Sequence, residues 1–259
     1  MKPRLLTPAL LSALALVTSS AFAGEVLDRI EQNKEIRVGV TGDYMPFSEK
    51  LSDGSYVGIE HDLAAVIAEQ LGVKLTLVPT SWPTLMEDFQ AGKYDIGMSG
   101  ISVTDARKEY AYFSNSYYNY GKTPITRCED VEKFDSMAKI DQPDTTVIIN
   151  EGGTNAIFAR ANLKQAKLHV EPTNKYVYDR ILDGTVDLMI PDSVEADYRA
   201  RHHDELCRSM PGFEFTESTI ATMMPKDDEL KARINAALSE LEQNGQLDKI
   251  IDKNMGIKI

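Results

Sequence analysis

The sequence predicts an α/β fold with mostly parallel sheets, and two observations carry this prediction. Short apolar runs recur along the chain, and runs of this length are typical of strands buried on both faces of a parallel sheet. They cover residues 36–40, 74–78, 94–98, 145–150 and 186–190. Amphipathic helical stretches lie between these runs, and the alternation of strands with helices is typical of α/β proteins.

The helical stretches have recognisable ends. Residues 57–72 place apolar side chains on one helical face and finish at Gly72, a residue type common just beyond a helix. A helix is also expected over 81–93, with Ser81 as its N-cap and Gly92 beyond its end. Further helices are expected over residues 155–163, over 173–184, and twice within the tail 213–256.

The N-terminal segment 1–23 has the pattern of a cleaved secretory signal. Lys2 and Arg4 precede an apolar run, and an A-x-A site follows it at residues 21–23. The run is too short to span a membrane, and no later stretch is long and apolar enough. We therefore expect cleavage after Ala23, no membrane insertion and a periplasmic protein. A buried N-terminal helix is the alternative.

The composition excludes some partners. The formal net charge is −12, and removal of the signal makes it more negative. Because nucleic acids and anionic membrane surfaces repel an acidic chain, we expect neither as a partner. This does not bear on a small anionic ligand, whose binding is decided by local charges. The length that remains suits one large domain or two lobes of ordinary size.

The two cysteines, Cys128 and Cys207, are the only pair in the chain. In an oxidising compartment we expect them to form one disulfide, with two free buried thiols as the alternative. Their spacing fits no zinc motif. The sequence contains neither a Walker loop nor a G-x-G-x-x-G motif, so we expect no metal and no cofactor.

Several segments resemble known proteins. Those at 39–48, 58–72 and 92–107 ("GVTGDYMPFS", "GIEHDLAAVIAEQLG" and "GKYDIGMSGISVTDAR") resemble bacterial periplasmic solute-binding proteins for polar amino acids. This resemblance extends over residues 25–256. More specific segments resemble one group within that family, the cyclohexadienyl dehydratases, which are periplasmic enzymes built on the binding-protein fold. They are "YGKTPITRC" (120–128), "GGTN" (152–155) and "VEA" (194–196).

The resemblance implies a periplasmic binding protein-like type II fold, with two lobes joined by a two-strand hinge. We place lobe 1 at residues 24–120 plus 217–259, and lobe 2 at residues 121–216. The two crossing strands are expected near residues 119–125 and 214–223.

The resemblance also implies an activity in the cleft between the lobes. Cyclohexadienyl dehydratases are lyases that convert prephenate to phenylpyruvate and arogenate to phenylalanine, without a cofactor. The alternative is a receptor that binds a polar or aromatic amino acid and serves an ABC permease. Both classes use the same fold, so the fold does not decide between them.

Prephenate carries two carboxylates, so the resemblance requires cations and N–H groups in the cleft. Arg107 follows a buried strand, where ligands bind in open α/β sheets, and a guanidinium fits a carboxylate through two hydrogen bonds. In the binding-protein family the matching arginine holds the α-carboxylate of the ligand; a surface arginine is the alternative. Ser99, Gly100 and Ser102 precede it and offer hydroxyls and backbone N–H groups.

A second anion site is predicted at the glycine pair of residues 152–155. This segment follows a buried strand and opens a helix, so that its backbone can approach an anion closely. Thr154 and Asn155 add side-chain donors at the helix N-terminus. An ordinary turn is the alternative.

The resemblance assigns the chemistry to Glu195 and Lys122. Loss of water requires an acid, and Glu195 matches the proton donor of the dehydratases. A carboxyl in a dry cleft has a raised pKa, which keeps it protonated. The alternative is a glutamate that stabilises a helix N-terminus. Lys122 in the hinge would bind a carboxylate or the leaving oxygen, unless it is a solvated lysine on an edge strand. Asp192 matches the family aspartate that holds a ligand ammonium.

Aromatic residues complete the predicted site. Trp82, the only tryptophan, is expected to form a floor for the substrate ring, with core packing as the alternative. Asp43 and Phe47 follow the first predicted strand, where the family places ligand contacts. An aromatic side chain at that point often covers the ligand.

Overall fold

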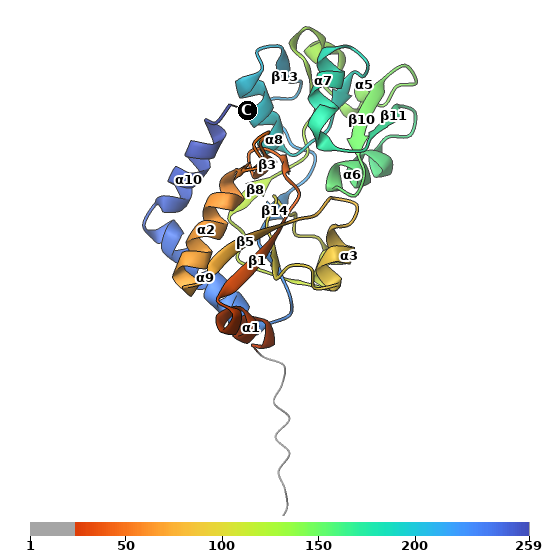
Figure 1. The fold of residues 1–259 in the computed structure, drawn as a ribbon. Coiled ribbons are helices and arrows are strands. Elements are labelled where there is room, and N and C mark those ends of the chain that lie inside the picture. The colour runs from red at the N-terminus through yellow and green to blue at the C-terminus, as the bar shows by residue number, and fades with distance from the viewer. Residues whose placement is uncertain (1–23, 259) are drawn as a thin grey trace, which may run out of the picture.

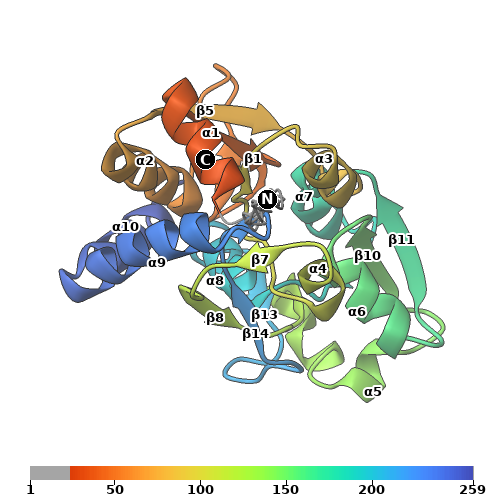
Figure 2. The same cartoon turned by 90° about the horizontal axis from the view of Figure 1, so that it is seen from below.

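The computed structural model describes residues 24–258, and the predicted signal segment lies outside the described residues. Two five-stranded sheets occupy different parts of the molecule, with a short two-stranded sheet between them (Figure 1). In the view turned by 90°, the helices and strands from both ends of the described chain lie together in one lobe, and those from the middle of the chain form the other lobe (Figure 2). The predicted two-lobed α/β fold is therefore confirmed.

The first lobe is built on a sheet with the strand order β5-β1-β6-β15-β7. Strands β5, β1 and β6 are parallel, whereas β15 is antiparallel to both of its neighbours. The strands are β1 (Glu35–Val40), β5 (Lys74–Pro79), β6 (Ile96–Gly97), β7 (Tyr112–Phe113) and β15 (Met223–Met224). The helices of this lobe are α1 (Glu25–Asn33), α2 (Ile59–Leu71), α3 (Leu85–Gln90), α4 (Asp105–Lys108), α9 (Asp228–Gln243) and α10 (Gln246–Met255). A small antiparallel sheet adjoins it, made of β2 (Asp43–Tyr44), β3 (Ser48–Lys50) and β4 (Tyr56–Val57).

The second lobe repeats the plan with the strand order β11-β10-β12-β9-β13. Strands β11, β10 and β12 are parallel, and β9 is antiparallel to β12 and β13. The strands are β9 (Ile125–Arg127), β10 (Thr146–Asn150), β11 (Lys167–Glu171), β12 (Leu188–Met189) and β13 (Leu206–Arg208). The helices are η1 (Cys128–Lys133), α5 (Met137–Ile140), α6 (Thr154–Asn162), η2 (Asn174–Tyr176), α7 (Val177–Leu182) and α8 (Ser193–His202).

Two chain crossings connect the lobes. Strands β8 (Tyr118–Tyr120) and β14 (Ser218–Ile220) pair in antiparallel fashion, in the two regions where the hinge was predicted. Gly121 follows β8, and a Cβ there would lie 2.0 Å from the carbonyl oxygen of Thr216, so only glycine lets the two crossings come this close. We propose lobe boundaries at 120/121 and 216/217, because the strands of the two large sheets fall on either side of them.

Helix α2 illustrates why the segments fold where the sequence predicts. Ile59, Leu63 and Ile67, four residues apart, are buried against the first sheet, as the amphipathic pattern predicts. Gly58 precedes the helix and Gly72 follows it, both at positive φ (135° and 67°). At Gly58 a Cβ would lie 2.2 Å from the carbonyl oxygen of Phe47, so glycine is required for packing as well as for conformation.

Helix α3 begins later than the sequence predicts. We expected Ser81 at the N-cap, but the N-cap is Thr84. The proline at position 83 disfavours a helical conformation for Trp82, and the chain instead makes a turn in which the N–H of Thr84 donates to the carbonyl of Ser81 at 3.1 Å. The late start leaves Trp82 in a loop, where its side chain faces the space between the lobes.

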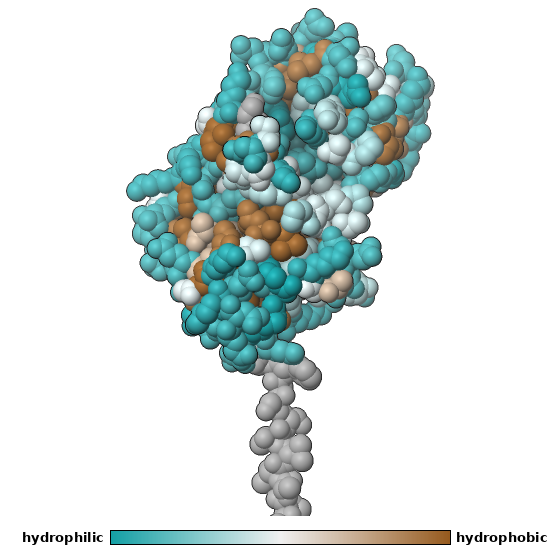
Figure 3. Space-filling model, in the orientation of Figure 1, coloured by the Kyte–Doolittle hydropathy of each residue, from teal (hydrophilic) through white to brown (hydrophobic). Residues whose placement is uncertain are grey.

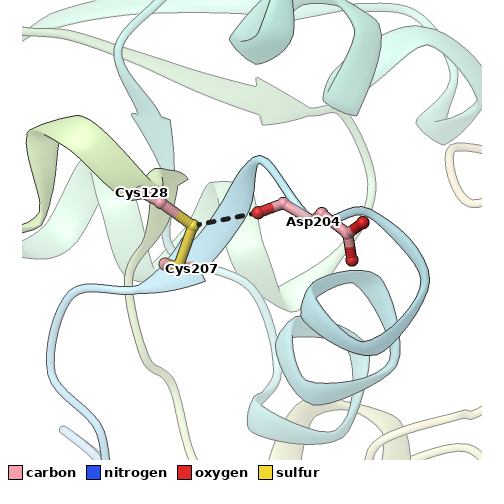
Figure 4. Close-up of a disulfide and its surroundings, with 3 residues drawn as sticks. All are labelled: Cys128, Asp204 and Cys207. Carbon is pink, nitrogen blue, oxygen red and sulfur yellow. Dashed lines mark hydrogen bonds between the residues drawn. A yellow bond between two sulfur atoms is a disulfide. The ribbon is translucent and has the colours of Figure 1, made fainter.

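The two cysteines form the predicted disulfide. Cys128 directly follows β9, and Cys207 lies in the neighbouring strand β13, with 4.8 Å between the two Cα atoms. The Cys128 sulfur also lies 3.5 Å from the main-chain oxygen of Asp204 (Figure 4). The bond thus links two positions that are 79 residues apart in the sequence.

Among the described residues, no helix is both long and apolar enough to cross a membrane. On the face shown in Figure 3 the surface is mostly hydrophilic, and apolar residues form separate patches instead of a continuous band. The large apolar side chains with the greatest exposure are Tyr110, Ile157, Val170, Tyr176 and Phe213. Scattered exposed side chains of this kind are ordinary on protein surfaces.

Candidate functional site

A small cavity of about 20 Å³ lies between the lobes. Its wall is formed by loops that follow the strand ends, where ligands bind in open α/β sheets. The first lobe contributes Tyr44, Trp82, Gly100, Ser102 and Arg107. The second lobe contributes Asn150, Gly153, Thr154, Asn155, Asn174 and Asp192. The structure therefore brings most of the predicted substrate-binding residues together around one cavity.

Lys122 and Asp192 form a buried ion pair beside this cavity, with side chains that are each 4% exposed. The Lys122 ammonium also donates to Oγ1 of Thr154 at 2.9 Å and to Oδ1 of Asn155. The second carboxylate oxygen of Asp192 accepts a hydrogen bond from the Tyr44 hydroxyl. Lys122 is thus not a solvated edge-strand lysine: it connects the hinge to the helix that begins at Thr154.

Arg107 lies in α4 with only 8% of its surface exposed. Its Nη1 donates to the carbonyl of Ser102 at 2.8 Å, and no carboxylate of the described chain comes within 4.0 Å of the guanidinium. Burial lowers the pKa of Arg107 from its very high ordinary value. A buried cation that faces a cavity without an anionic partner is costly, and a ligand carboxylate would compensate it.

Glu195 lies in the first turn of α8, one turn after Asp192, and is completely buried. Neither of its carboxyl oxygens makes a hydrogen bond of good geometry within the described chain, although the hydroxyl of Tyr178 lies beside the carboxyl. Burial raises the pKa of Glu195 to about 7, although the positive charge of Arg199 opposes the rise. The carboxyl does not itself line the cavity, but the charges of Asp192 and Lys122 act on it. Near neutral pH a large fraction of the molecules therefore carries a proton on this carboxyl, in a water-poor environment.

Phe47 does not line the cavity, in contrast to the expectation from the sequence. It is fully buried, with its ring 5.5 Å from the ring of Tyr44 and 5.6 Å from that of Tyr118. The N–H of Phe47 donates to the carbonyl of Tyr44, so the chain turns between them and sends Phe47 into the core. The aromatic residue of this loop that reaches the cavity is Tyr44, and Phe47 packs against it.

Asp43 and Ser99 are also displaced from the cavity wall. Asp43 accepts hydrogen bonds from the Trp82 indole at 3.0 Å and from the backbone N–H of Asn174 at 3.3 Å, so it joins the two lobes. Burial raises its pKa. Ser99 is fully buried, and its hydroxyl accepts from the N–H of Thr41 at 2.8 Å. Both side chains shape the loops of the site and do not face its interior.

Two asparagines that line the cavity were not predicted from the sequence. Asn150 ends β10 and Asn174 opens η2, and the side-chain oxygen of each is buried without a donor. Such atoms are uncommon in folded proteins, and a ligand hydroxyl or ammonium would satisfy them. Their positions next to predicted strand and helix ends were the available signal, but asparagine is also an ordinary turn residue.

The two lobes, the two-strand hinge and the cavity between them define a type II periplasmic binding protein fold. The chain belongs to the bacterial extracellular solute-binding proteins, family 3, whose model matches residues 36–257. Small-molecule binding is the common property that this membership supports.

Individual relatives are more specific. The chain is 45% identical to the cyclohexadienyl dehydratase of Pseudomonas aeruginosa over 239 residues, which cover 92% of this chain and 89% of the relative. It resembles the crystal structure of the ancestral amino acid-binding protein AncCDT-1, a precursor of cyclohexadienyl dehydratase, with a TM-score of 0.83 and 32% identity over 89% of this chain and 100% of that one. A variant of an ancestral cyclohexadienyl dehydratase, AncCDT-3, is 44% identical over 89% of this chain and 96% of that one, with a TM-score of 0.56.

Proposed function

We propose that this chain is a cyclohexadienyl dehydratase, which converts prephenate to phenylpyruvate and arogenate to phenylalanine in the inter-lobe cavity. The single observation that carries the proposal is the Glu195 carboxyl, which is completely buried without a hydrogen-bond partner close to a cavity that Arg107 lines and Lys122 adjoins. Its pKa of about 7 allows it to act as an acid near neutrality. The 45% identity to a cyclohexadienyl dehydratase supports the same activity.

The cations of the site bind the two carboxylates of prephenate. Arg107 holds the side-chain carboxylate, because its guanidinium is buried and has no other anion within 4.0 Å in the described chain. Lys122 lies beside the cavity with its three donors engaged by Thr154, Asn155 and Asp192. It would therefore bind the ring carboxylate or the leaving oxygen by exchanging one of these partners, together with the N–H groups at the start of α6. Trp82 and Tyr44, whose rings meet edge-on at 5.8 Å, provide an apolar wall for the six-membered ring.

Glu195 donates the proton that the leaving group needs. Because it lies next to the cavity wall and not in it, this role requires substrate binding to bring the leaving hydroxyl into contact with the carboxyl. The bond between the ring and its carboxylate breaks, its electrons enter the ring, and the C4–O bond breaks in turn. The hydroxyl leaves as water with the proton of Glu195, and the carboxylate leaves as carbon dioxide. The ring becomes aromatic, and Glu195 regains its proton from solvent. Burial suits this role, because it disfavours the charged form of the acid before the reaction.

A receptor for an amino acid is the second candidate, and membership of a solute-binding family favours it. A receptor would use Asp192 for the ligand ammonium. The charge of Asp192 is already neutralised by Lys122 in a buried ion pair, so a ligand ammonium would have to compete with Lys122 for this carboxylate. A receptor would also have no task for a buried acid at position 195, so these observations favour the enzyme.

Membership of the family indicates where in the cell the protein acts. We infer a periplasmic protein whose signal is removed after Ala23, and membership of an extracellular family supports this location. The substrates are prephenate and arogenate, with neither nucleic acid nor membrane as a partner. An ABC permease becomes a partner only if the chain is a receptor.

The test is to incubate the purified chain with prephenate and to measure the formation of phenylpyruvate, and with arogenate to measure phenylalanine. The same preparation is titrated calorimetrically with a panel of amino acids. Product formation above the spontaneous rate supports the enzyme. Absence of both products together with tight binding of one amino acid would replace this proposal with the receptor.

A further inference from the structure

Arg199 lies four residues after Glu195 on α8, so the two side chains share a face of the helix. The guanidinium carbon of Arg199 is 4.5 Å from the ring centroid of Tyr178 and 5.6 Å from that of Tyr198. A planar cation held over two aromatic rings has little freedom to reorient. No carboxylate of the described chain lies within 4.0 Å of it, so its position is set by the rings and not by an ion pair.

A group of buried polar atoms without partners surrounds this contact. Both carboxyl oxygens of Glu195, the hydroxyl of Tyr178 and Nε of Arg199 are buried and unpaired within the described chain. Tyr178 is only 4% exposed, and its hydroxyl lies beside the Glu195 carboxyl. Unpaired buried groups are individually costly, so several side by side indicate a task that requires them free.

The other charges around Glu195 largely compensate one another. The titratable groups that face it are Tyr44 of β2, Lys122 after β8, Tyr178 of α7, and Asp192 and Arg199 of α8. Lys122 and Asp192 form an ion pair, and burial raises the pKa of both tyrosines, which therefore stay neutral. Arg199 is the charge left to act on Glu195, and it also acts on Glu49 of β3.

We propose that Arg199 is a positioning residue for the proton donor: its guanidinium, held against the ring of Tyr178, stabilises the carboxylate that Glu195 becomes when it gives up its proton. This inference rests on the proposed dehydratase function. Before proton transfer the acid is neutral and needs no partner. After transfer the new carboxylate accepts a hydrogen bond from the Tyr178 hydroxyl and is attracted by Arg199, and both groups are already in place.

The experiment compares Glu195 in wild type and in Arg199→Met, which keeps an unbranched side chain and loses the charge. The carboxyl carbons of glutamate are labelled with ¹³C, the Glu195 signal is assigned from its absence in Glu195→Gln, and its titration is followed by NMR. Removal of a nearby positive charge should raise the pKa of Glu195 by about one unit above the wild-type value. The alkaline limb of the pH–rate profile should move upward equally, because the protonated acid is the active form.

Three further variants separate this role from a structural one. Arg199→Lys restores the charge and should return the Glu195 titration toward wild type. Tyr178→Phe keeps the ring but loses the hydroxyl, and should also raise the pKa of Glu195. Arg201→Met removes the same charge from an exposed position on the same helix and should change neither the titration nor the pH limb.

The outcomes are distinct. An upward shift in Arg199→Met with rescue by Arg199→Lys supports the inference. A Glu195 titration that is unchanged in Arg199→Met, or shifted equally by Arg201→Met, overturns it even if the enzyme is active. If wild type makes neither phenylpyruvate nor phenylalanine, the proposed function has failed, and the NMR titration alone still decides whether Arg199 acts on Glu195.

Discussion

The hydroxyl of Tyr44 donates a hydrogen bond to the carboxylate of Asp192, and these two residues belong to different lobes. Tyr44 ends β2 beside the first sheet, whereas Asp192 is the N-cap of α8 in the second lobe. The same carboxylate pairs with Lys122 at the hinge. The ion pair lies within the second lobe, so closure of the cleft brings Tyr44 of the first lobe onto a carboxylate that Lys122 already holds in place.

Gly152→Ala should impair closure of the cleft. Gly152 has a φ of 81°, and a Cβ there would lie 2.4 Å from the carbonyl carbon of Trp82 in the other lobe. The extra methyl group would hold the lobes apart, so product affinity should fall. The radius of gyration with bound product, measured by small-angle X-ray scattering, should exceed that of wild type with the same ligand.

Gly184→Ala is the matched control. Gly184 has a similar φ of 78°, but a Cβ there would meet no atom within 4 Å. The Gly184→Ala variant has the same kind of backbone strain, but far from the contact between the lobes. Its cleft should therefore close as it does in wild type. If Gly152→Ala closes as fully as Gly184→Ala, the two lobes do not meet at this glycine in solution.

Arg107→Ala should weaken substrate binding strongly. Loss of one partner of a buried, charge-assisted contact costs about 2–5 kcal/mol, which corresponds to roughly 30-fold or more in the Michaelis constant. Steady-state kinetics with prephenate measure the change. Lys108→Ala, an exposed neighbour on the same short helix, should have little effect. An effect of Arg107→Ala below about threefold would mean that Arg107 does not contact substrate.

The regular elements were predictable because their signals are local. The apolar runs at 36–40 and 145–150 became β1 and β10, and Gly72 ended its helix as predicted. A prediction failed where one proline changed the local geometry: the turn at Trp82 moved the start of α3. Helix periodicity takes no account of such a turn, because it describes only the spacing of side chains.

The sequence predicted those site residues that directly follow a strand. Arg107 and Thr154 follow buried strands, and the structure brings both to the cavity. Which aromatic side chain of a turn faces the cavity depends on tertiary packing, so Phe47 was expected there and Tyr44 occupies the place. The pairing of Lys122 with Asp192 joins positions 70 residues apart, and no spacing pattern in the sequence reports such a contact.

Glu60→Gln should reduce the loss of stability that accompanies a rise in pH from about 5 to about 8. Glu60 is buried beneath the cavity loop, where Gly100 N–H donates to it at 2.7 Å and the Tyr117 hydroxyl also donates. Burial raises the pKa of Glu60 from 4.5 to about 8. The folded state thus keeps a proton that the unfolded state loses, so the free energy of unfolding declines as pH rises from about 4.5 to about 8.

Urea unfolding at pH 5 and at pH 8 measures this decline. Glutamine mimics the neutral carboxyl, so the difference between the two pH values should be smaller in Glu60→Gln than in wild type. It should not vanish, because Glu195 and Glu49 have pKa values raised in the same direction. Glu69→Gln, an exposed position on the same helix, should retain the wild-type difference. An identical decline in Glu60→Gln would show that Glu60 is ionised at neutral pH.

Removal of the disulfide should destabilise the chain by about 4 kcal/mol, from the loop-closure entropy of its long loop. The double variant Cys128→Ser/Cys207→Ser tests this by equilibrium unfolding in urea. Intact-mass analysis after alkylation without reductant should show no free thiol in wild type. Two alkylated cysteines would instead mean that the bond is absent in the purified protein.

The proposed activity is tested most directly by Glu195→Gln with prephenate as substrate. Glutamine has nearly the same shape and still offers a hydrogen bond, but it cannot deliver a proton. General acid catalysis contributes typically about 10²–10⁴-fold. Turnover to phenylpyruvate should therefore fall by that order while substrate affinity changes little, and the wild-type rate should decline as pH rises through about 7, the pKa of the buried carboxyl. Wild-type turnover in Glu195→Gln would contradict the assignment of the proton donor, and no phenylpyruvate from the wild-type chain would contradict the dehydratase itself.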